Sequence, residues 1–242
     1  MRRRWAMMNN ADDTIVVLLP GLWMPAWVML FLQRKIELAG FRCTRFGYAS
    51  ARAGLEENSA RLAAFVRALG GSRVYLVGHS LGGVLALHAT RTHALGQVRR
   101  IVMIGSPWRD SFVARRMLRY AFGRWLLGKT VPQWLACAKP PAPRDVEVGA
   151  VAGTVPSGLG MLFAPGMPRP HDGVIRVEET PVQGMAAYIE LRVSHAGMLL
   201  SRRVADRVGR FLLHGRFEPA GQAQSAPAAD ERYPLGPERE SR

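Results

Sequence analysis

Strand-like apolar runs alternate with amphipathic segments along most of this chain. The candidate strands lie at 14–19, 42–47, 73–78, 98–104, 146–152 and 187–193. Apolar residues recur at helical spacing in the segments 26–39, 56–70, 81–94 and 200–213. Strands that alternate with helices are typical of a parallel sheet covered by helices. We therefore predict an α/β fold with a mostly parallel sheet of about six strands and flanking helices.

Two segments interrupt this alternation. Residues 107–145 lie between two predicted strands and contain eight Lys or Arg, two Asp and six aromatic residues. Insertions of this length are usually lids, binding loops or disordered segments, and the aromatic content favours packed structure. We predict a helical cap here, either a mobile lid over a pocket or a fixed element with a solvated basic face. Residues 217–242 are rich in Pro, Ala, Gln, Ser and Glu, which predicts a disordered tail from about Phe217 and a folded domain over 12–215.

The chain is strongly basic, with 33 Lys and Arg against 18 Asp and Glu and a formal charge of +15. Such a balance favours contact with phosphates or anionic lipid. We find no helix-turn-helix pattern, zinc-ligand spacing or aromatic RNA-binding strand, so no specific nucleic acid is expected as a partner. Residues 107–145 alone carry a net charge of +6, which favours peripheral contact with an anionic membrane near this segment.

Cysteine usage and hydropathy indicate the compartment. The two cysteines, Cys43 and Cys137, cannot form a disulfide framework, and neither has metal-ligand spacing. The basic start of the chain is followed by polar residues rather than by the apolar run of a signal peptide. Residues 33–35 interrupt the longest apolar stretch, so no transmembrane helix is expected. We expect a cytoplasmic protein without a metal or organic cofactor, with peripheral membrane contact as an alternative.

The sequence Gly78-His79-Ser80-Leu81-Gly82 matches G-x-S-x-G between a predicted strand and a predicted helix. A nucleophile elbow needs this strand–turn–helix context, because its serine lies on a strained turn where bulky neighbours would clash. The flanking glycines relieve that crowding, and the helix N-terminus presents backbone N–H groups to an oxyanion. The pentapeptide alone is a weak indication, but its position at the end of a central strand makes it specific.

With this motif, the chain resembles α/β-hydrolases of the bacterial esterase/lipase type over about residues 12–215. The resemblance implies Ser80 as the nucleophile, with the acid and the histidine later in the chain, in that order. His195 directly follows the last predicted strand, where this fold carries its catalytic histidine. The resemblance therefore implies His195 as the general base.

The acid of this site is expected on the loop after the predicted strand 146–152. Asp172 lies there in a Pro-His-Asp-Gly-Val segment, similar to the Asp-Gly-x-Val segment of many lipase-like hydrolases. This loop leaves the carboxyl edge of the sheet, as do Ser80 and His195. Glu178 and Glu179 are the alternatives for the acid.

The resemblance also implies an oxyanion hole made by two backbone N–H groups. One belongs to Leu81, the residue after the nucleophile, and the other to Leu22 on the loop after the first strand. The family usually has His-Gly-x in that loop, whereas this chain has Pro20-Gly21-Leu22. This departure leaves open how the loop is supported.

The function implied is hydrolysis of a carboxylic ester, from a small molecule or a lipid, through an acyl-enzyme. Fold alone does not determine the chemistry, so thioesterase, amidase and acyltransferase activities remain alternatives. A non-catalytic basic binding protein on the same fold is the alternative from another class. The segment Gly123–Thr130 also matches the phosphate-binding pattern G-x-x-x-x-G-K-[ST]. Because an amphipathic helix rather than a buried strand precedes it, we interpret this match as a coincidence.

Overall fold

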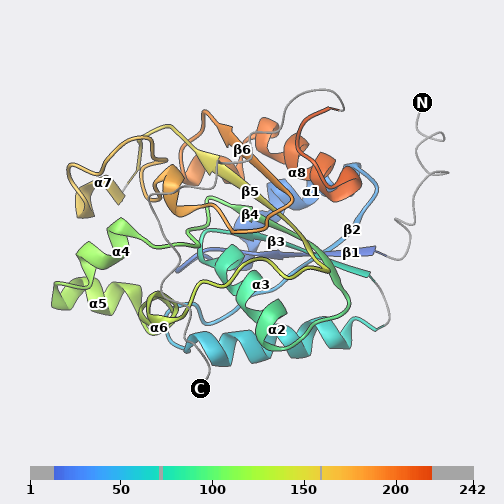
Figure 1. Cartoon of the computed structure of the whole chain (residues 1–242), viewed down its shortest axis with the longest axis horizontal. Coiled ribbons are helices and arrows are strands. Elements are labelled where there is room, and N and C mark those ends of the chain that lie inside the picture. The colour runs from blue at the N-terminus through green and yellow to red at the C-terminus, as the bar shows by residue number, and fades with distance from the viewer. Residues whose placement is uncertain (1–13, 71–72, 159, 220–242) are drawn as a thin grey trace, which may run out of the picture.

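The fold is built on a single six-stranded parallel sheet (Figure 1). A computed structural model describes residues 14–70, 73–158 and 160–219. The strands are β1 (Thr14–Leu19), β2 (Arg42–Arg45), β3 (Arg73–His79), β4 (Val98–Ile104), β5 (Glu147–Gly153) and β6 (Ala187–Leu191). Their order is β2-β1-β3-β4-β5-β6, and every neighbouring pair is parallel. The predicted α/β class and parallel sheet are therefore confirmed.

Helices cover both faces of this sheet (Figure 1). One face is packed by α2 (Leu55–Ala68) and α3 (Leu81–Thr92), and the other by α1 (Leu30–Leu38) and α8 (Arg202–His214). Short 3-10 helices are η3 (Ala26–Met29), η4 (Val177–Glu179) and η5 (Ala196–Leu199). Along β1, Val17 points into the core under α2 and α3, while Val16 points into the core under α1 and α8. Because both faces are covered, the inner strands β1, β3 and β5 are largely apolar rather than alternating, whereas the edge strand β2 is polar and only partly buried.

The segment between β4 and β5 forms the predicted helical cap. Its helices are α4 (Phe112–Met117), α5 (Ala121–Leu127) and α6 (Thr130–Ala136), and they lie together at one end of the molecule (Figure 1). The Ser111 hydroxyl caps α4 by accepting the N–H of Ala114 at 3.2 Å. Met117, Leu127 and Trp134 are buried in the core shared with α2 and α3. Part of the insert's apolar residues thus packs inward, whereas Phe122 and Trp125 of α5 stay exposed.

The segment that matches the phosphate-binding pattern has a structural explanation. Gly128 has a φ of +61°, and a Cβ atom there would lie 2.6 Å from the Cα atom of Ala51. The N–H of Lys129 donates to the carbonyl oxygen of Ala51 at 2.9 Å. The buried Thr130 hydroxyl donates to the carbonyl oxygen of Ala53 at 2.9 Å. The Gly-Lys-Thr residues therefore pack α6 against the segment before α2, which agrees with the interpretation as a coincidence.

The end of the domain differs from the expectation. Phe217, predicted to begin a solvated tail, is fully buried, and its ring stacks on Phe211 with centroids 4.9 Å apart. A Cβ atom at Gly149 would lie 2.8 Å from the Phe217 ring, so this glycine makes room for it. Arg207 donates to the Phe217 carbonyl oxygen at 3.1 Å and to the Glu218 carboxylate at 2.8 Å. Packing against α8 therefore extends past residue 215, and residues 12–13 and 220–242 lie outside the described residues.

No helix in the described ranges is long and apolar enough to cross a bilayer. Within the same ranges, no group of three or more His, Cys, Asp and Glu side chains is arranged to hold a metal ion. Cys43 and Cys137 are both free thiols.

Candidate active site

Ser80 lies on a strained turn between β3 and α3. Its φ and ψ are 52° and −122°, a region that costs a non-glycine residue about 1–3 kcal/mol. Two backbone hydrogen bonds hold the turn. The Ser80 N–H donates to the carbonyl oxygen of Ile104 at 2.9 Å, and the Ser80 carbonyl oxygen accepts the N–H of Gly83 at 3.1 Å. This strand–turn–helix geometry is that of a nucleophile elbow.

Glycines around this serine are required by close backbone packing. A Cβ atom at Gly78 would overlap the backbone nitrogen of Gly83 across the turn. At Gly82, a Cβ atom would lie 2.5 Å from the carbonyl oxygen of Pro20 and closer still to that of Leu19. The start of α3 therefore touches the loop after β1 directly, without intervening side chains.

His195 and Asp172 meet at the carboxyl edge of the sheet, on the loops after β6 and β5. Because a carboxylate only accepts, His195 Nδ1–H donates to Asp172 Oδ2, at 2.8 Å. The other carboxylate oxygen, Oδ1, accepts the N–H groups of Val174 at 2.9 Å and Ile175 at 2.7 Å. The His195 N–H also donates to the Asp172 carbonyl oxygen at 2.9 Å. The buried carboxylate is thus oriented on both oxygens, and it leaves Nε2 of His195 available.

Ser80 and His195 line the same cavity, which has a volume of about 300 Å³. Leu22 and Leu81, the residues predicted to form the oxyanion hole, also line it. The remaining walls are largely apolar and come from the loop after β1, the cap and α7 (Gly160–Phe163); they include Met24, Val113, Met117, Leu127, Val131, Trp134 and Phe163. No Asp, Glu, Lys or Arg lines the cavity among the described residues. The volume lies at the lower end of the range for small-molecule sites.

The two predicted oxyanion donors are backbone N–H groups that have no acceptor among the described residues. Leu81 is the first residue of α3, so its N–H has no acceptor within the helix. The N–H of Leu22 makes no hydrogen bond to any of the residues that the structure describes. Both residues border the cavity beside Ser80, which is the position that an oxyanion hole requires.

The loop that carries Leu22 is supported by side chains that sequence reasoning did not identify. The Tyr48 hydroxyl donates to the carbonyl oxygen of Pro20 at 2.9 Å. Trp23, with a φ of 61°, donates its N–H to Ser50 Oγ at 3.0 Å and its indole N–H to the carbonyl oxygen of Leu126 at 2.6 Å. These contacts hold the Pro-Gly-Leu loop where the family usually has His-Gly-x, and they connect it to α5 of the cap.

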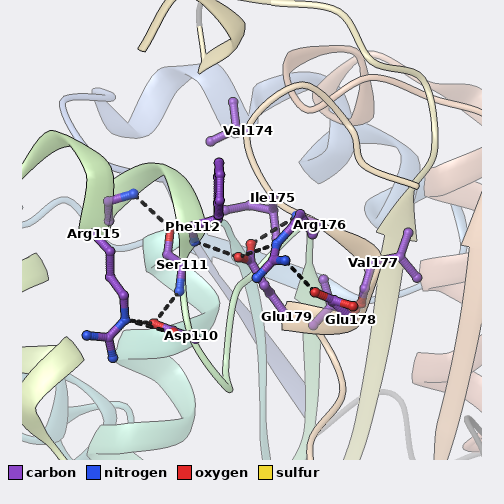
Figure 2. A network of polar contacts seen from close by, with 12 residues as sticks. Asp110, Ser111, Phe112, Arg115, Val174, Ile175, Arg176, Val177, Glu178 and Glu179 are labelled. Carbon is purple, nitrogen blue, oxygen red and sulfur yellow. Dashed lines mark hydrogen bonds and ion pairs between the residues drawn. The ribbon is translucent and has the colours of Figure 1, made fainter. Parts of the chain in front are cut away.

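Glu178 and Glu179, the alternative acids, have other partners (Figure 2). The buried Glu179 carboxylate accepts the N–H of Phe112 at 2.6 Å, the N–H of Arg176 at 2.9 Å and the Arg176 Nε–H at 3.0 Å. Glu178 is half-exposed and pairs with the Arg176 guanidinium at 2.5 Å. Burial raises the pKa of Glu179, while its hydrogen bonds and Arg176 oppose that rise. Neither glutamate bonds to His195, so Asp172 is the residue in the position of the acid.

Glu179 instead anchors the cap to the loop that bears Asp172. Its carbonyl oxygen accepts the N–H groups of Trp108 at 2.7 Å and Arg109 at 3.0 Å. Its carboxylate holds the first N–H of α4, as Figure 2 shows. The start of the cap and the acid loop therefore form one hydrogen-bonded unit. Nothing local in the sequence marks this role, because the partners lie about 70 residues apart in the chain.

His79, which sequence reasoning did not consider, lies directly beneath the candidate site. It is fully buried, its Nε2–H donates to the carbonyl oxygen of His195 at 3.0 Å, and the two rings are 4.7 Å apart. Burial and the neighbouring His195 lower the pKa of His79 to about 3, so its ring is neutral near pH 7. The neutral ring supports His195 from below. Its position directly before Ser80 in the elbow motif was the available indication.

A serine on a nucleophile elbow, beside an aspartate-bonded histidine at the carboxyl edge of a parallel sheet, defines the architecture of the α/β-hydrolases. Residues 16–232 match the profile of the alpha/beta hydrolase family, and the chain belongs to this family.

Individual relatives agree with this assignment. The chain is 35% identical over 123 residues to a putative carbamate hydrolase RutD of Pantoea ananatis (strain LMG 20103). That match covers 46% of this chain and 45% of the relative, so it spans less than half of the relative's length.

Solved structures share the fold at low sequence identity. A lipase, BlEst2 of Bacillus licheniformis, has a TM-score of 0.69 at 17% identity, over 85% of this chain and 92% of that chain. The phospholipase PlaB of Legionella pneumophila has a TM-score of 0.62 at 15% identity, over 82% and 60% of the two chains. A metagenomic carboxyl esterase, MGS0156, has a TM-score of 0.60 at 16% identity, over 77% and 65%. At these identities the likeness shows the fold.

Proposed function

We propose that this protein is a serine hydrolase that cleaves carboxylic esters through an acyl-enzyme. The observation that carries the proposal is the shared cavity, which brings the strained Ser80 and the Asp172-bonded His195 together. Asp172 holds the imidazole in the tautomer with its proton on Nδ1, which leaves Nε2 as the base. The family assignment and the lipase and esterase folds among the neighbours support the same reaction class.

The proposed reaction has two steps. In the first, His195 Nε2 takes the hydroxyl proton of Ser80 as Oγ attacks the ester carbonyl, and the N–H groups of Leu22 and Leu81 stabilise the tetrahedral oxyanion. His195 then gives that proton to the leaving alkoxide, and the acyl group remains on Ser80. In the second, His195 deprotonates a water molecule that attacks the acyl-enzyme. Collapse of this second intermediate releases the carboxylic acid and returns the proton to Ser80.

The cavity walls favour an apolar acyl group. Side chains from α4, α5 and α6 enclose the space above Ser80, and a charged acyl group would find no opposite charge on the walls. Burying an ion without a partner costs far more than burying an apolar chain of the same size. We therefore expect uncharged acyl chains that fit within about 300 Å³.

Carbamates are the second candidate class of substrate. The observation in their favour is the match to a putative carbamate hydrolase over about half of the chain. A carbamate carbonyl meets the same nucleophile and the same oxyanion donors as an ester carbonyl. Thioester hydrolysis and acyl transfer would use the same residues, so the substrate has to be assigned by assay.

A fluorophosphonate probe tests the nucleophile. We expect the wild-type protein and Ser157→Ala, which removes an exposed hydroxyl, to be labelled equally. Ser80→Ala should not be labelled. Labelling that persists in Ser80→Ala would sink the assignment, and a wild-type protein that takes no label would support a non-catalytic binding protein. Rates on p-nitrophenyl esters of increasing chain length, beside a p-nitrophenyl carbamate, then assign the substrate class.

A further inference from the structure

Four large aromatic side chains are exposed beside the cavity. The exposed fractions are 49% for Trp23, 62% for Tyr120, 61% for Phe122 and 66% for Trp125. Three of them touch, with ring centroids 5.7 Å apart for Phe122 and Trp125 and 6.3 Å apart for Trp23 and Trp125. Single exposed aromatics are normal in soluble proteins, but a contiguous group marks an interaction surface. We call these four residues the aromatic face.

The aromatic face lies at the entrance of the candidate active site. Trp23 belongs to the face and also lines the cavity with Ser80, so the two features share a border. Leu126, whose carbonyl oxygen accepts the indole N–H of Trp23, lines the cavity as well. Phe122 and Trp125 belong to α5, which lies with α4 at one end of the molecule (Figure 1).

The surroundings of the aromatic face are positively charged. Residues 111–144 contain seven Lys and Arg and no Asp or Glu. Arg116, Arg119 and Arg124 are exposed and form no ion pair with any residue in the described ranges. A partner for this surface must therefore supply negative charge as well as apolar contact.

These observations favour one partner over the others. A second copy of this chain would place the same arginines opposite each other, which charge repulsion disfavours. Tyr and Trp rings suit the boundary between lipid headgroups and acyl chains, because each combines an apolar body with a polar tip. Exposed arginines are attracted to anionic headgroups. Nucleic acid could stack on the rings, but it would not explain why the face borders an apolar cavity.

We propose that the aromatic face, together with Arg119 and Arg124, docks on the surface of an anionic lipid bilayer. The rings enter the headgroup region while the arginines contact the lipid phosphates. Docking places the mouth of the cavity against the lipid. Delivery of a lipid ester to Ser80 rests on the proposed function, whereas docking itself does not.

Vesicle sedimentation tests docking without turnover. Every protein carries Ser80→Ala, so the result does not depend on hydrolysis. We expect binding to phosphatidylcholine vesicles that contain about one third phosphatidylglycerol, weak binding to pure phosphatidylcholine, and a loss of binding at high salt. Equal binding to the two vesicle types, or no binding to either, would overturn the proposal.

Paired variants locate the binding surface. Arg119→Gln/Arg124→Gln should weaken binding about fivefold per arginine, and Phe122→Ala/Trp125→Ala should weaken it at least as much. The matched charge control is Arg73→Gln/Arg99→Gln, which removes two exposed arginines at the amino edge of the sheet. If this control loses as much binding as the cap variant, the attraction is a property of net charge and the proposal is wrong.

Two other occupants of the face have distinct outcomes. Sedimentation velocity without vesicles tests self-association, and a dimer that Phe122→Ala/Trp125→Ala abolishes would assign the face to a second copy. In the sedimentation assay, poly(U) and free phosphatidylglycerol vesicles are compared as competitors at equal charge concentration. If poly(U) displaces the protein from the sedimenting vesicles more strongly, the face is assigned to nucleic acid. Either result overturns lipid docking, and a monomer that prefers the vesicles supports it.

Discussion

Gly82→Ala is the substitution for which the structure gives the clearest expectation. The added Cβ atom would lie 2.5 Å from the carbonyl oxygen of Pro20, whereas non-bonded atoms prefer separations of about 3.5–4.0 Å. The start of α3 and the loop after β1 must therefore move apart by about 1 Å. Because that loop carries Leu22, the movement widens the proposed oxyanion hole. The two carbonyl oxygens that this Cβ atom would meet, those of Leu19 and Pro20, belong to the backbone, so no flexible side chain can absorb the strain.

The expected loss has a structural and a catalytic part. Overpacking costs about 1–3 kcal/mol of unfolding free energy, which the gain in helix propensity of up to about 1 kcal/mol offsets in part. Loss of one oxyanion donor lowers kcat by about 10²–10³-fold. We expect kcat for a p-nitrophenyl ester to fall by about 10²-fold with little change in KM, and the protein to lose about 1–2 kcal/mol.

Gly209→Ala in α8 is the matched control. Its Cβ atom would meet only the Cβ of Ala39, at 3.9 Å, which is an ordinary contact. Stability should rise by up to about 1 kcal/mol, and kcat should not change. Urea unfolding measures stability, and active-site titration normalises kcat to the folded fraction. If Gly82→Ala keeps kcat within about threefold of the wild type, the contact between α3 and the loop after β1 does not position the oxyanion donors.

Buried polar groups support the candidate site and the cap, and their substitution has measurable effects. Asp172→Asn should lower kcat by about 10⁴-fold while the fold is kept, because an amide favours the wrong imidazole tautomer; an unchanged kcat in a folded protein would refute its role. Since burial depresses the pKa of His79 to about 3, its neutral form contributes stability above about pH 6.5 that is lost as the pH falls toward 3. In His79→Gln, whose side chain cannot titrate, the unfolding free energy should fall less steeply with decreasing pH, by about 1.4 kcal/mol per pH unit. Urea unfolding between pH 4 and 6 measures this slope for both proteins. Identical slopes would contradict the depressed pKa of His79. Glu179→Gln should cost about 1–3 kcal/mol, because it weakens the contacts to Phe112 and Arg176, and unchanged thermal unfolding would show that this anchor does not stabilise the cap.

The sequence alone determined most of the central strands and helices and the position of the Ser80 turn. Strand and helix patterns are local, and a strand buried on both faces has to be apolar throughout, so its position can be read from a few residues. The elbow motif is local for the same reason, since Gly78 and Gly82 clear the backbone within and beside a single turn. The order of parallel strands then places the loops with Asp172 and His195 at the same edge as Ser80.

Only the tertiary structure decided which partner each side chain meets. Asp172 and Glu179 lie seven residues apart on one loop, yet Asp172 bonds to His195 while Glu179 bonds to the start of the cap. The polar neighbours of Phe217 predicted the start of a tail, but its ring is buried in the space that the missing side chain of Gly149 leaves. The Trp23 indole could not be assigned to Leu126 from the sequence, because the two residues are 103 positions apart. Such choices depend on distances between segments remote in the chain, which composition and periodicity do not contain.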